Sequence, residues 1–285
     1  MRIGVIGGSG IYAMEGLEDV REVRVATPFG DPSDAVILGR LGGAEMAFLP
    51  RHGRGHRFNP SEVNYRANLY ALKTLGVEWV ISVSAVGSLK HEIVPGHIVV
   101  IDQFIDRTVA RKSTFFEGGV VAHVAFGDPV CPTLRGILLD AAREAGATVH
   151  DGGTYVCMEG PAFSSKAESN LHRSWGASVI GMTNMPEAKL AREAELSYAT
   201  LAMATDYDCW HPDHDHVTVD QVVKVLLENA NLARRVVAAA VPRIVAHGGP
   251  APMSSALATA IMTAPELVSS ATRERLAPIL GKYLP

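Results

Sequence analysis

Cysteine is scarce in this sequence, and long apolar runs are absent. The 285 residues include three cysteines, which are widely separated and form no CxxC or CxC pair. Neither a disulfide framework nor a thiolate zinc site is therefore expected, and a reducing cytoplasm is the simplest location. No apolar run is long enough to span a bilayer, and strand-like sequence follows Met1 so closely that no signal peptide is expected.

The chain also lacks an excess of charge of either sign. The formal net charge is -4, and the content of 20% charged and 47% hydrophobic residues is ordinary for a globular protein. This balance gives no electrostatic reason to expect nucleic acid or an anionic membrane as a partner. The sequence contains no repeats and no low-complexity segments, so one domain with a sizeable core is expected.

The apolar pattern predicts an α/β fold, a single domain with a central mixed β-sheet flanked by helices. Strands are predicted at residues 3–6, 23–26, 36–39, 46–49, 77–84, 98–104, 149–158, 178–182 and 198–205. Helices are predicted at residues 60–75, 132–144, 166–175, 186–194 and 220–247. This domain is assigned residues 1–248, and residues 249–285 are assigned to a linker and a helical tail that packs on the body or on a neighbouring subunit.

The stretch at residues 201–210 is an apolar run that ends in two carboxylates, Asp206 and Asp208. The run suits a strand that is buried on both faces. In an extended chain alternate side chains share a face, so both carboxylates are expected on one side. Two like charges at the end of an apolar strand raise at least one pKa, which is typical of a functional site. The alternative is a strand that runs out into a solvated loop.

Other predicted strands also end in residues that suit an anion. The glycine-rich turn at residues 7–10 either holds an anion on its backbone N–H groups or is only a tight turn. Arg51 and His52 offer donors that suit phosphate, although surface basic runs are often merely solvated. The small residues that follow Ser84 would let backbone amides approach a ligand closely. Open α/β sheets bind ligands at such strand ends.

Two segments that contain histidine do not by themselves predict a functional site. Histidine and aspartate alternate at residues 211–216, but contiguous side chains on a loop point outward rather than converging. No metal site is therefore predicted there. His123 lies in a short apolar stretch and, considered alone, is expected to be a packing residue.

Together these segments resemble the S-methyl-5'-thioadenosine phosphorylases of the trimeric purine nucleoside phosphorylase family. The resemblance covers residues 3–236 and rests on motifs that occur in order, among them Gly7-Gly8-Ser9-Gly10, Thr27-Pro28-Phe29-Gly30, Arg51-His52-Gly53, Ile101-Asp102-Gln103-Phe104 and Ala204-Thr205-Asp206-Tyr207-Asp208-Cys209-Trp210. It implies that inorganic phosphate attacks C1' of 5'-methylthioadenosine and releases adenine and 5-methylthioribose 1-phosphate. Phosphate is a co-substrate, and no cofactor or metal is expected.

The resemblance also implies a role for individual residues. Asp206 would donate a proton to purine N7, and Asp208 would accept from the 6-amino group, which favours aminopurines over 6-oxopurines. The remaining site residues are Ser9, Arg51, His52, Ser84, Ala85 and Thr183 for phosphate, and Phe163, Met182, Val219, Val222 and His123 for the nucleoside. His123 would reach in from a neighbouring subunit, so a homotrimer, alone or as a dimer of trimers, is expected.

The sequence departs from the family pattern at three positions. Ser9 stands where threonine is usual, Ala162 where arginine is common, and Val86 where many relatives have cysteine. The tail lacks the paired cysteines of some archaeal members, so no disulfide-stabilised hexamer is expected. Two rival functions stay open, namely a 6-oxopurine nucleoside or methylthioinosine phosphorylase and a non-catalytic nucleotide-binding protein.

Overall fold

The computed structural model describes residues 1–8, 10–212 and 219–284, without the side chains of residues 219–224 and 226–228. In this part of the chain, eleven strands form one mixed sheet. Its centre is parallel and consists of β4 (Ala44–Pro50), β1 (Arg2–Gly7), β5 (Trp79–Ser88) and β11 (Ser197–Asp206). The predicted mixed sheet with flanking helices is therefore confirmed.

The outer strands extend the sheet on both sides of this parallel centre. On one side, β2 (Glu18–Val23) and β3 (Val36–Leu41) run antiparallel to their neighbours. The strands on the other side are β10 (Val179–Gly181), β9 (Thr154–Met158) and β7 (Gln103–Arg107), whereas β6 (Ile98–Val100) and β8 (Val149–Asp151) continue from β11.

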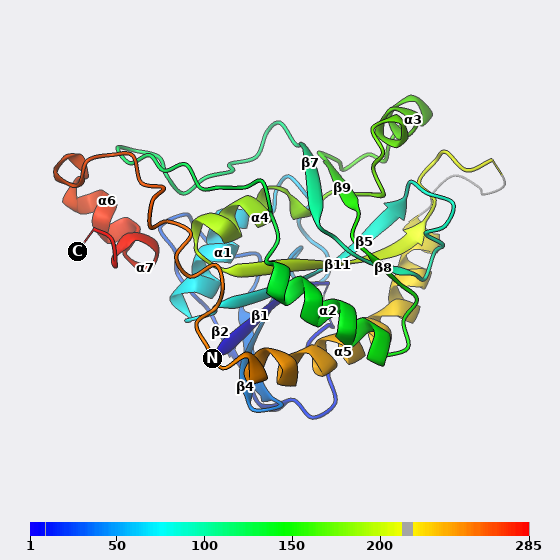
Figure 1. Cartoon of the computed structure of the whole chain (residues 1–285), viewed down its shortest axis with the longest axis horizontal. Helices are drawn as coiled ribbons and strands as arrows, with labels where there is room; N and C mark the ends of the chain where they lie inside the picture. The colour runs from blue at the N-terminus through cyan, green and yellow to red at the C-terminus, as the bar shows by residue number, and fades with distance from the viewer. Residues whose placement is uncertain (9, 213–218, 285) are drawn as a thin grey trace.

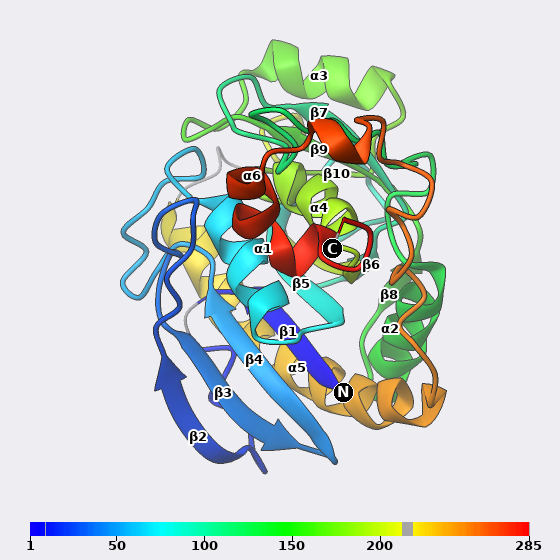
Figure 2. The same ribbon diagram turned by 90° about the vertical axis from the view of Figure 1, so that its left-hand side faces the viewer.

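Helices cover both faces of the sheet, as Figure 1 and Figure 2 show. On one face, α2 (Pro132–Glu144) and α5 (Val219–His247) pack on a core that includes Trp79 and Leu138. On the other face lie α1 (Tyr65–Thr74) and α4 (Asn184–Glu193). Residues 197–205 of β11 are all buried, as expected for a strand between two helical layers.

Two predicted strands are each broken into two, which corrects the predictions at residues 98–104 and 149–158. The breaks fall at Asp102 and at Gly152-Gly153, where the Gly153 N–H donates to Asp102 Oδ1 at 2.9 Å. The two glycines have φ angles of 87° and 149°, which residues with a side chain rarely adopt. Both breaks fall at residues typical of turns, Asp102 in one segment and Asp151-Gly152-Gly153 in the other, which the predictions place inside strands.

The tail packs on the body beside α1 and α4, and Figure 2 shows its red helices in front of both. Its short helices are a 3-10 helix (Pro265–Leu267), α6 (Ser270–Arg275) and α7 (Ala277–Leu280). Leu276 and Leu280 are each 0% exposed. The tail also pairs with the loop after β7, because the His123 N–H donates to Ala260 O at 2.8 Å and the Met262 N–H donates to Val121 O at 2.9 Å.

Glu193, a buried residue at the end of α4, holds the same loop at an earlier point. Its carboxylate accepts from the Thr114 hydroxyl at 2.8 Å and from the Phe115 N–H at 2.7 Å. Burial raises the pKa of Glu193 to about 7, although both hydrogen bonds oppose this shift. Near neutral pH this carboxyl therefore titrates inside the protein.

We predict that Glu193 lowers the free energy of unfolding as the pH rises from about 4.5 to about 7. The unfolded carboxyl releases its proton near 4.5, but the folded one retains it up to about 7, so ionisation favours the unfolded state across this window. Glu193→Gln should reduce the loss by up to about 3 kcal/mol. Urea unfolding at pH 5 and pH 8 measures this loss of unfolding free energy, and Glu266→Gln on the surface is the control. An equal dependence on pH in the Glu193 variant and the parent would contradict the prediction.

Candidate active site

Asp206 ends β11, and Asp208 lies in the turn that follows. Asp208 has a φ of 51°, and its N–H donates to Asp206 Oδ1 at 2.8 Å. The expectation that strand alternation brings the carboxylates to one side was therefore wrong in its cause, since a turn does so. Both residues face Gly87 of β5, where an added Cβ would lie 2.9 Å from Asp206 Oδ1 and 3.3 Å from Asp208 Cβ. Gly87 thus provides the space that this turn requires.

The two carboxyls are electrostatically different. Burial raises the pKa of Asp206, hydrogen bonds from the Thr205 hydroxyl and the Asp208 N–H lower it, and the negative charge of Asp208 raises it further. Burial also raises the pKa of Asp208, and the nearby Ser169 and Ser164 hydroxyls lower it. The two carboxyls thus differ in their hydrogen-bond donors, and because their repulsion is mutual, the pair retains one proton more readily than an isolated carboxyl would.

One oxygen of this pair is buried without a partner among the described residues. Asp208 is 7% exposed, and its Oδ2 accepts no hydrogen bond there. A buried acceptor of this kind costs free energy unless a donor reaches it. The position therefore suits a ligand that brings an N–H group.

A cluster of buried hydroxyls lies further back along β5. Ser84 Oγ is 3.4 Å from Thr183 Oγ1 and 3.3 Å from the Tyr155 hydroxyl oxygen. Ala85, which is half-buried, follows Ser84 on the strand. The structure therefore brings the predicted Ser84, Ala85 and Thr183 together and adds Tyr155, which sequence reasoning missed because an aromatic residue in an apolar strand indicates only packing. Hydroxyl donors that converge in this way can bind the oxygens of an anion.

The Arg51 guanidinium is committed to the interior. It donates to Glu187 at 2.7 Å and 3.0 Å, to Ser82 Oγ at 2.7 Å and to Val83 O at 3.1 Å. The Arg51 side chain is 3% exposed and that of Glu187 is 1% exposed, so the pair is a buried salt bridge. Glu187 carried no sequence signal, since an acidic residue in a helix normally faces solvent. Arg51 is thus one half of an internal ion pair rather than a free fork of donors.

His52 is a neutral imidazole rather than a cation. Burial, and then the charge of Arg51, lower the pKa of His52 to about 4. Its Nδ1 lies 2.8 Å from Phe58 O, which can only accept, so Nδ1 carries the proton and Nε2 presents a lone pair. Arg54, in the same basic segment, pairs with Glu22 and with Asp34, which neutralise it. The segment therefore provides one buried cation and one acceptor, not the set of donors that the sequence suggested.

The loop at residues 159–163 carries Phe163 and packs over Met182. The Phe163 side chain is 46% exposed, and an added Cβ on Gly160 would lie 2.6 Å from Met182 Sδ. The Arg111 side chain, 1% exposed, holds this region by donating to Glu159 O and Met182 O at 2.6 Å each. A cation therefore lies under the loop even though Ala162 lacks the charge that relatives have there.

Three predicted residues or their side chains lie outside the described part of the chain, and a fourth, His123, lies elsewhere. Ser9 lies outside the described residues, as do the side chains of Val219 and Val222 at the start of α5. His123 is exposed, contrary to the packing role considered for it, and it lies on the loop that pairs with the tail. In Figure 1 the tail is at one end of the molecule and the arrowheads of β5 and β11 point toward the other.

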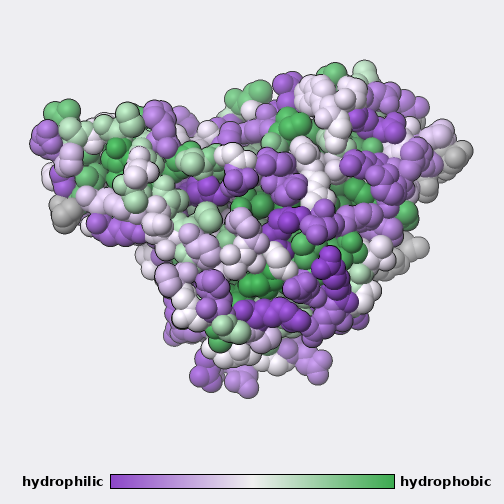
Figure 3. Space-filling model, in the orientation of Figure 1, coloured by the Kyte–Doolittle hydropathy of each residue, from purple (hydrophilic) through white to green (hydrophobic). Residues whose placement is uncertain are grey.

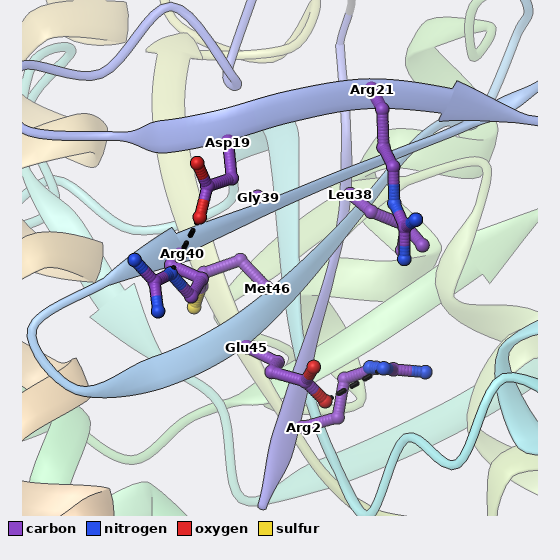
Figure 4. A pocket seen from close by; sticks show the side chains of 8 residues that line it. All are labelled: Arg2, Asp19, Arg21, Leu38, Gly39, Arg40, Glu45 and Met46. Atoms are coloured by element: carbon purple, nitrogen blue, oxygen red, sulfur yellow. Dashed lines mark hydrogen bonds and ion pairs between the residues drawn. The ribbon is translucent and has the colours of Figure 1, made fainter.

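A cavity of about 320 Å³ lies elsewhere, beside β2, β3 and β4 (Figure 4). Four of its five charged side chains form ion pairs, Arg2 with Glu45 at 2.6 Å and Arg40 with Asp19 at 2.8 Å. None of the predicted site residues lines it. The cavity is therefore separate from the candidate active site.

Comparisons with known proteins agree with this geometry. The model of the phosphorylase superfamily matches residues 2–242. The chain is 61% identical to the S-methyl-5'-thioadenosine phosphorylase of Geobacter sulfurreducens over 99% of both chains. It is 62% identical to that of Chloroflexus aurantiacus, covering 99% of this chain and 98% of the relative.

Solved structures show the same similarity. A methylthioadenosine phosphorylase from an antarctic soil metagenomic library superposes with a TM-score of 0.94 at 50% identity, covering 98% of each chain. The methylthioadenosine phosphorylase of Schistosoma mansoni in complex with adenine has a TM-score of 0.82 at 39% identity, covering 86% of this chain and 92% of that one. The fold is thus shared with proteins whose structures contain the base.

We predict that Arg51→Ala destabilises the protein by about 3–5 kcal/mol, because it leaves the Glu187 charge buried and unpaired. Glu187→Gln should destabilise it for the converse reason, and the double variant Arg51→Ala with Glu187→Gln should lose less than the sum of the two single losses. Urea unfolding at pH 7 measures each loss. Strictly additive losses would contradict the buried pair.

Proposed function

The chain belongs to the phosphorylase superfamily, and within it to the S-methyl-5'-thioadenosine phosphorylases, and we propose that it catalyses the reversible phosphorolysis of S-methyl-5'-thioadenosine. The products are adenine and 5-methylthioribose 1-phosphate, so the enzyme is a pentosyltransferase of purine and methionine salvage. The observation that carries the proposal is the pair of unlike carboxyls beside Gly87, with buried hydroxyls further back on the same strand.

The spacing of these two groups suits a nucleoside and phosphate. Ser84 and Gly87 are three positions apart on β5, which corresponds to about 10 Å in a strand. A ribose fits between an anion at the hydroxyls and a purine at the carboxyls. Phosphate bound beneath C1' is then positioned to attack as the glycosidic bond breaks.

Asp206 and Asp208 serve the leaving purine in different ways. Negative charge develops on the purine as the bond breaks, and a protonated Asp206 donates to N7. The unpartnered Asp208 Oδ2 accepts from the 6-amino group and repels a 6-oxo group. Phe163 packs on the purine face and Met182 on the ribose, while Val219 and Val222 are assigned to the methylthio group.

The phosphate end acts through charge and hydroxyl donors. Ser84, the Ala85 amide and Thr183 donate to phosphate oxygens, and Ser9 is assigned to the same anion. Arg51 is assigned to the same anion, and its contribution is limited because Glu187 balances its charge and its donors are largely occupied. The His52 Nε2 lone pair accepts from a protonated phosphate oxygen, a role open to a neutral imidazole. The chemistry requires no metal and no cofactor.

We assign the active form to a homotrimer, alone or as a dimer of trimers, in which His123 completes the site of a neighbouring subunit. The support is the position of His123 on the loop held by the tail, away from the carboxyl ends of β5 and β11 (Figure 1). Apolar side chains are exposed on this loop and on the tail (Figure 3). They include Val121 at 46%, Met262 at 67% and Leu267 at 73%. Such exposure is typical of an interface. The free cysteines suit a cytoplasmic location.

We predict that methylthioadenosine is cleaved only when phosphate is present, and that methylthioinosine is cleaved at least about tenfold less efficiently, as expected if one buried polar contact is mismatched. Asp206→Asn should move the preference toward the 6-oxo substrate, because an amide donates without being protonated. A phosphate-excess substrate panel, analysed by chromatography, measures both effects. A clear preference of the parent for methylthioinosine would favour the 6-oxopurine alternative, and no product at all would favour a binding protein.

We predict that co-expressed Asp206→Ala and His123→Ala chains regain activity that neither variant has alone. Each site of a randomly mixed trimer then has about a one-in-four chance of combining an intact Asp206 with an intact His123 from the next subunit. Activity at low methylthioadenosine should reach about a quarter of the parent value. Activity no greater than the average of the two variants would place both residues in one chain.

A further inference from the structure

Helix α3 (Lys166–Ser174) is a surface helix with two buried residues. Ser169 is 0% exposed and His172 is 5% exposed. Residues three apart on a helix share a face, so both side chains point into the protein from the same side of α3. Figure 1 shows α3 at the end of the molecule toward which β5 and β11 point. The buried face of α3 therefore meets the purine end of the site.

α3 and the loop before it pack against the segment that carries Asp208, because the Arg173 guanidinium lies 3.6 Å from the centre of the Trp210 ring and the Cys209 thiol donates to Ser164 O at 3.2 Å. The Ser169 hydroxyl is close enough to lower the pKa of Asp208, and the His172 imidazole lies within electrostatic range of the same carboxylate. Yet Asp208 Oδ2, Ser169 Oγ and His172 Nδ1 are all buried and make no hydrogen bond of good geometry within the described residues. Each such atom costs about 1–3 kcal/mol when it is left unpaired. Ser169 Oγ and His172 Nδ1 are therefore not committed to other groups of the described chain, and Asp208 Oδ2 is left for a ligand.

We propose that Ser169 and His172 are positioning residues that hold Asp208 as a hydrogen-bond acceptor for the exocyclic amine of the purine, and that they thereby set the preference for 6-amino over 6-oxo substrates. The proposal rests on the proposed function, because it assumes that Asp208 faces the purine. It assigns a role to two residues that do not contact the substrate themselves.

The chemistry follows from the donors that surround Asp208. A serine O–H and an imidazole N–H favour the ionised carboxylate, whereas burial and the neighbouring Asp206 favour the protonated one. A carboxylate accepts from an amine, but a carboxylic acid donates to a 6-oxo oxygen. Loss of either donor should therefore weaken the discrimination, because a larger fraction of Asp208 is protonated.

The other groups around Asp208 and His172 do not reverse the expected effect on the ionisation of Asp208. Burial lowers the pKa of His172, so the ring is neutral near pH 7 and offers one N–H. Asp208 and Glu168 oppose that shift, and Arg107 on β7 adds to it. On the other side, Asp208 is lined by the Ser164 hydroxyl and by the Cys209 N–H, both of which favour its ionised form.

A purely structural role for His172 makes a different prediction. Its ring lies edge-on to Trp175 with centroids 5.3 Å apart, so an aromatic replacement would preserve this contact. If packing were its only role, His172→Phe would leave substrate preference unchanged. A positioning role requires an N–H donor, which phenylalanine lacks and glutamine retains.

The test measures kcat/KM for methylthioadenosine and methylthioinosine, with saturating phosphate, from pH 5 to pH 8. In Ser169→Ala and His172→Phe we expect the ratio of the two values to fall about tenfold, which corresponds to a rise of one unit in the pKa of Asp208. The acidic limb of the methylthioadenosine profile should move to higher pH by the same unit. His172→Gln should restore most of the ratio, and Asn170→Ala on the exposed side of α3 should match the parent.

The outcomes separate the two proposals. If the parent prefers methylthioadenosine and both variants keep its ratio and pH profile, the positioning role is overturned while the proposed function holds. If Tm falls in the variants but the ratio stays constant, their role is structural and the positioning role is overturned as well. If the parent does not cleave methylthioadenosine with phosphate, the proposed function itself fails.

Discussion

The buried ion pair between Arg51 and Glu187 is the interaction on which the rest of the structure depends. It joins the end of β4 to α4 across 136 residues of sequence, and Ser82 of β5 bonds to both partners. Tyr198 of β11 donates to the same glutamate at 2.9 Å. Replacing one member leaves the other charge buried and unpaired, so the network fixes β4, β5 and β11 relative to one another. Ser84 lies on β5, and Asp206 ends β11.

The site is built on this rigid frame in two halves. The hydroxyls of Ser84 and Thr183 form one half, at position 84 of β5. The carboxyls at the end of β11 form the other half, opposite Gly87. Rigid strands place the anion and the base at a fixed separation, which suits a reaction whose barrier is lowered by positioning and charge. The loop with Phe163, which must admit substrate, lies outside the sheet, and the Arg111 side chain holds this region by donating to the Glu159 and Met182 carbonyls.

The tail holds the loop that carries His123. Its hydrogen bonds to the backbone of Val121 and His123 hold a loop that extends away from the chain's own carboxyl pair. The sequence pattern indicated a helical tail without indicating what it touches, because amphipathic periodicity reports that a face is buried but not against which residue. The same limit applies to α3, where Ser169 and His172 look like ordinary polar residues of a surface helix until their burial against Asp208 is known.

The sequence by itself determined the α/β class, most strand and helix positions, the apolar strand that ends at Asp206, and the family. These properties are local, since they depend on periodicity, turn residues and motifs that neighbouring positions create together. Only the tertiary structure decided that Arg51 is bound by Glu187, that His52 is neutral, and that a turn rather than an extended chain joins Asp206 to Asp208. Partners, pKa values and turn geometry arise from residues far apart in the chain, because burial and charge act through space and not along the sequence.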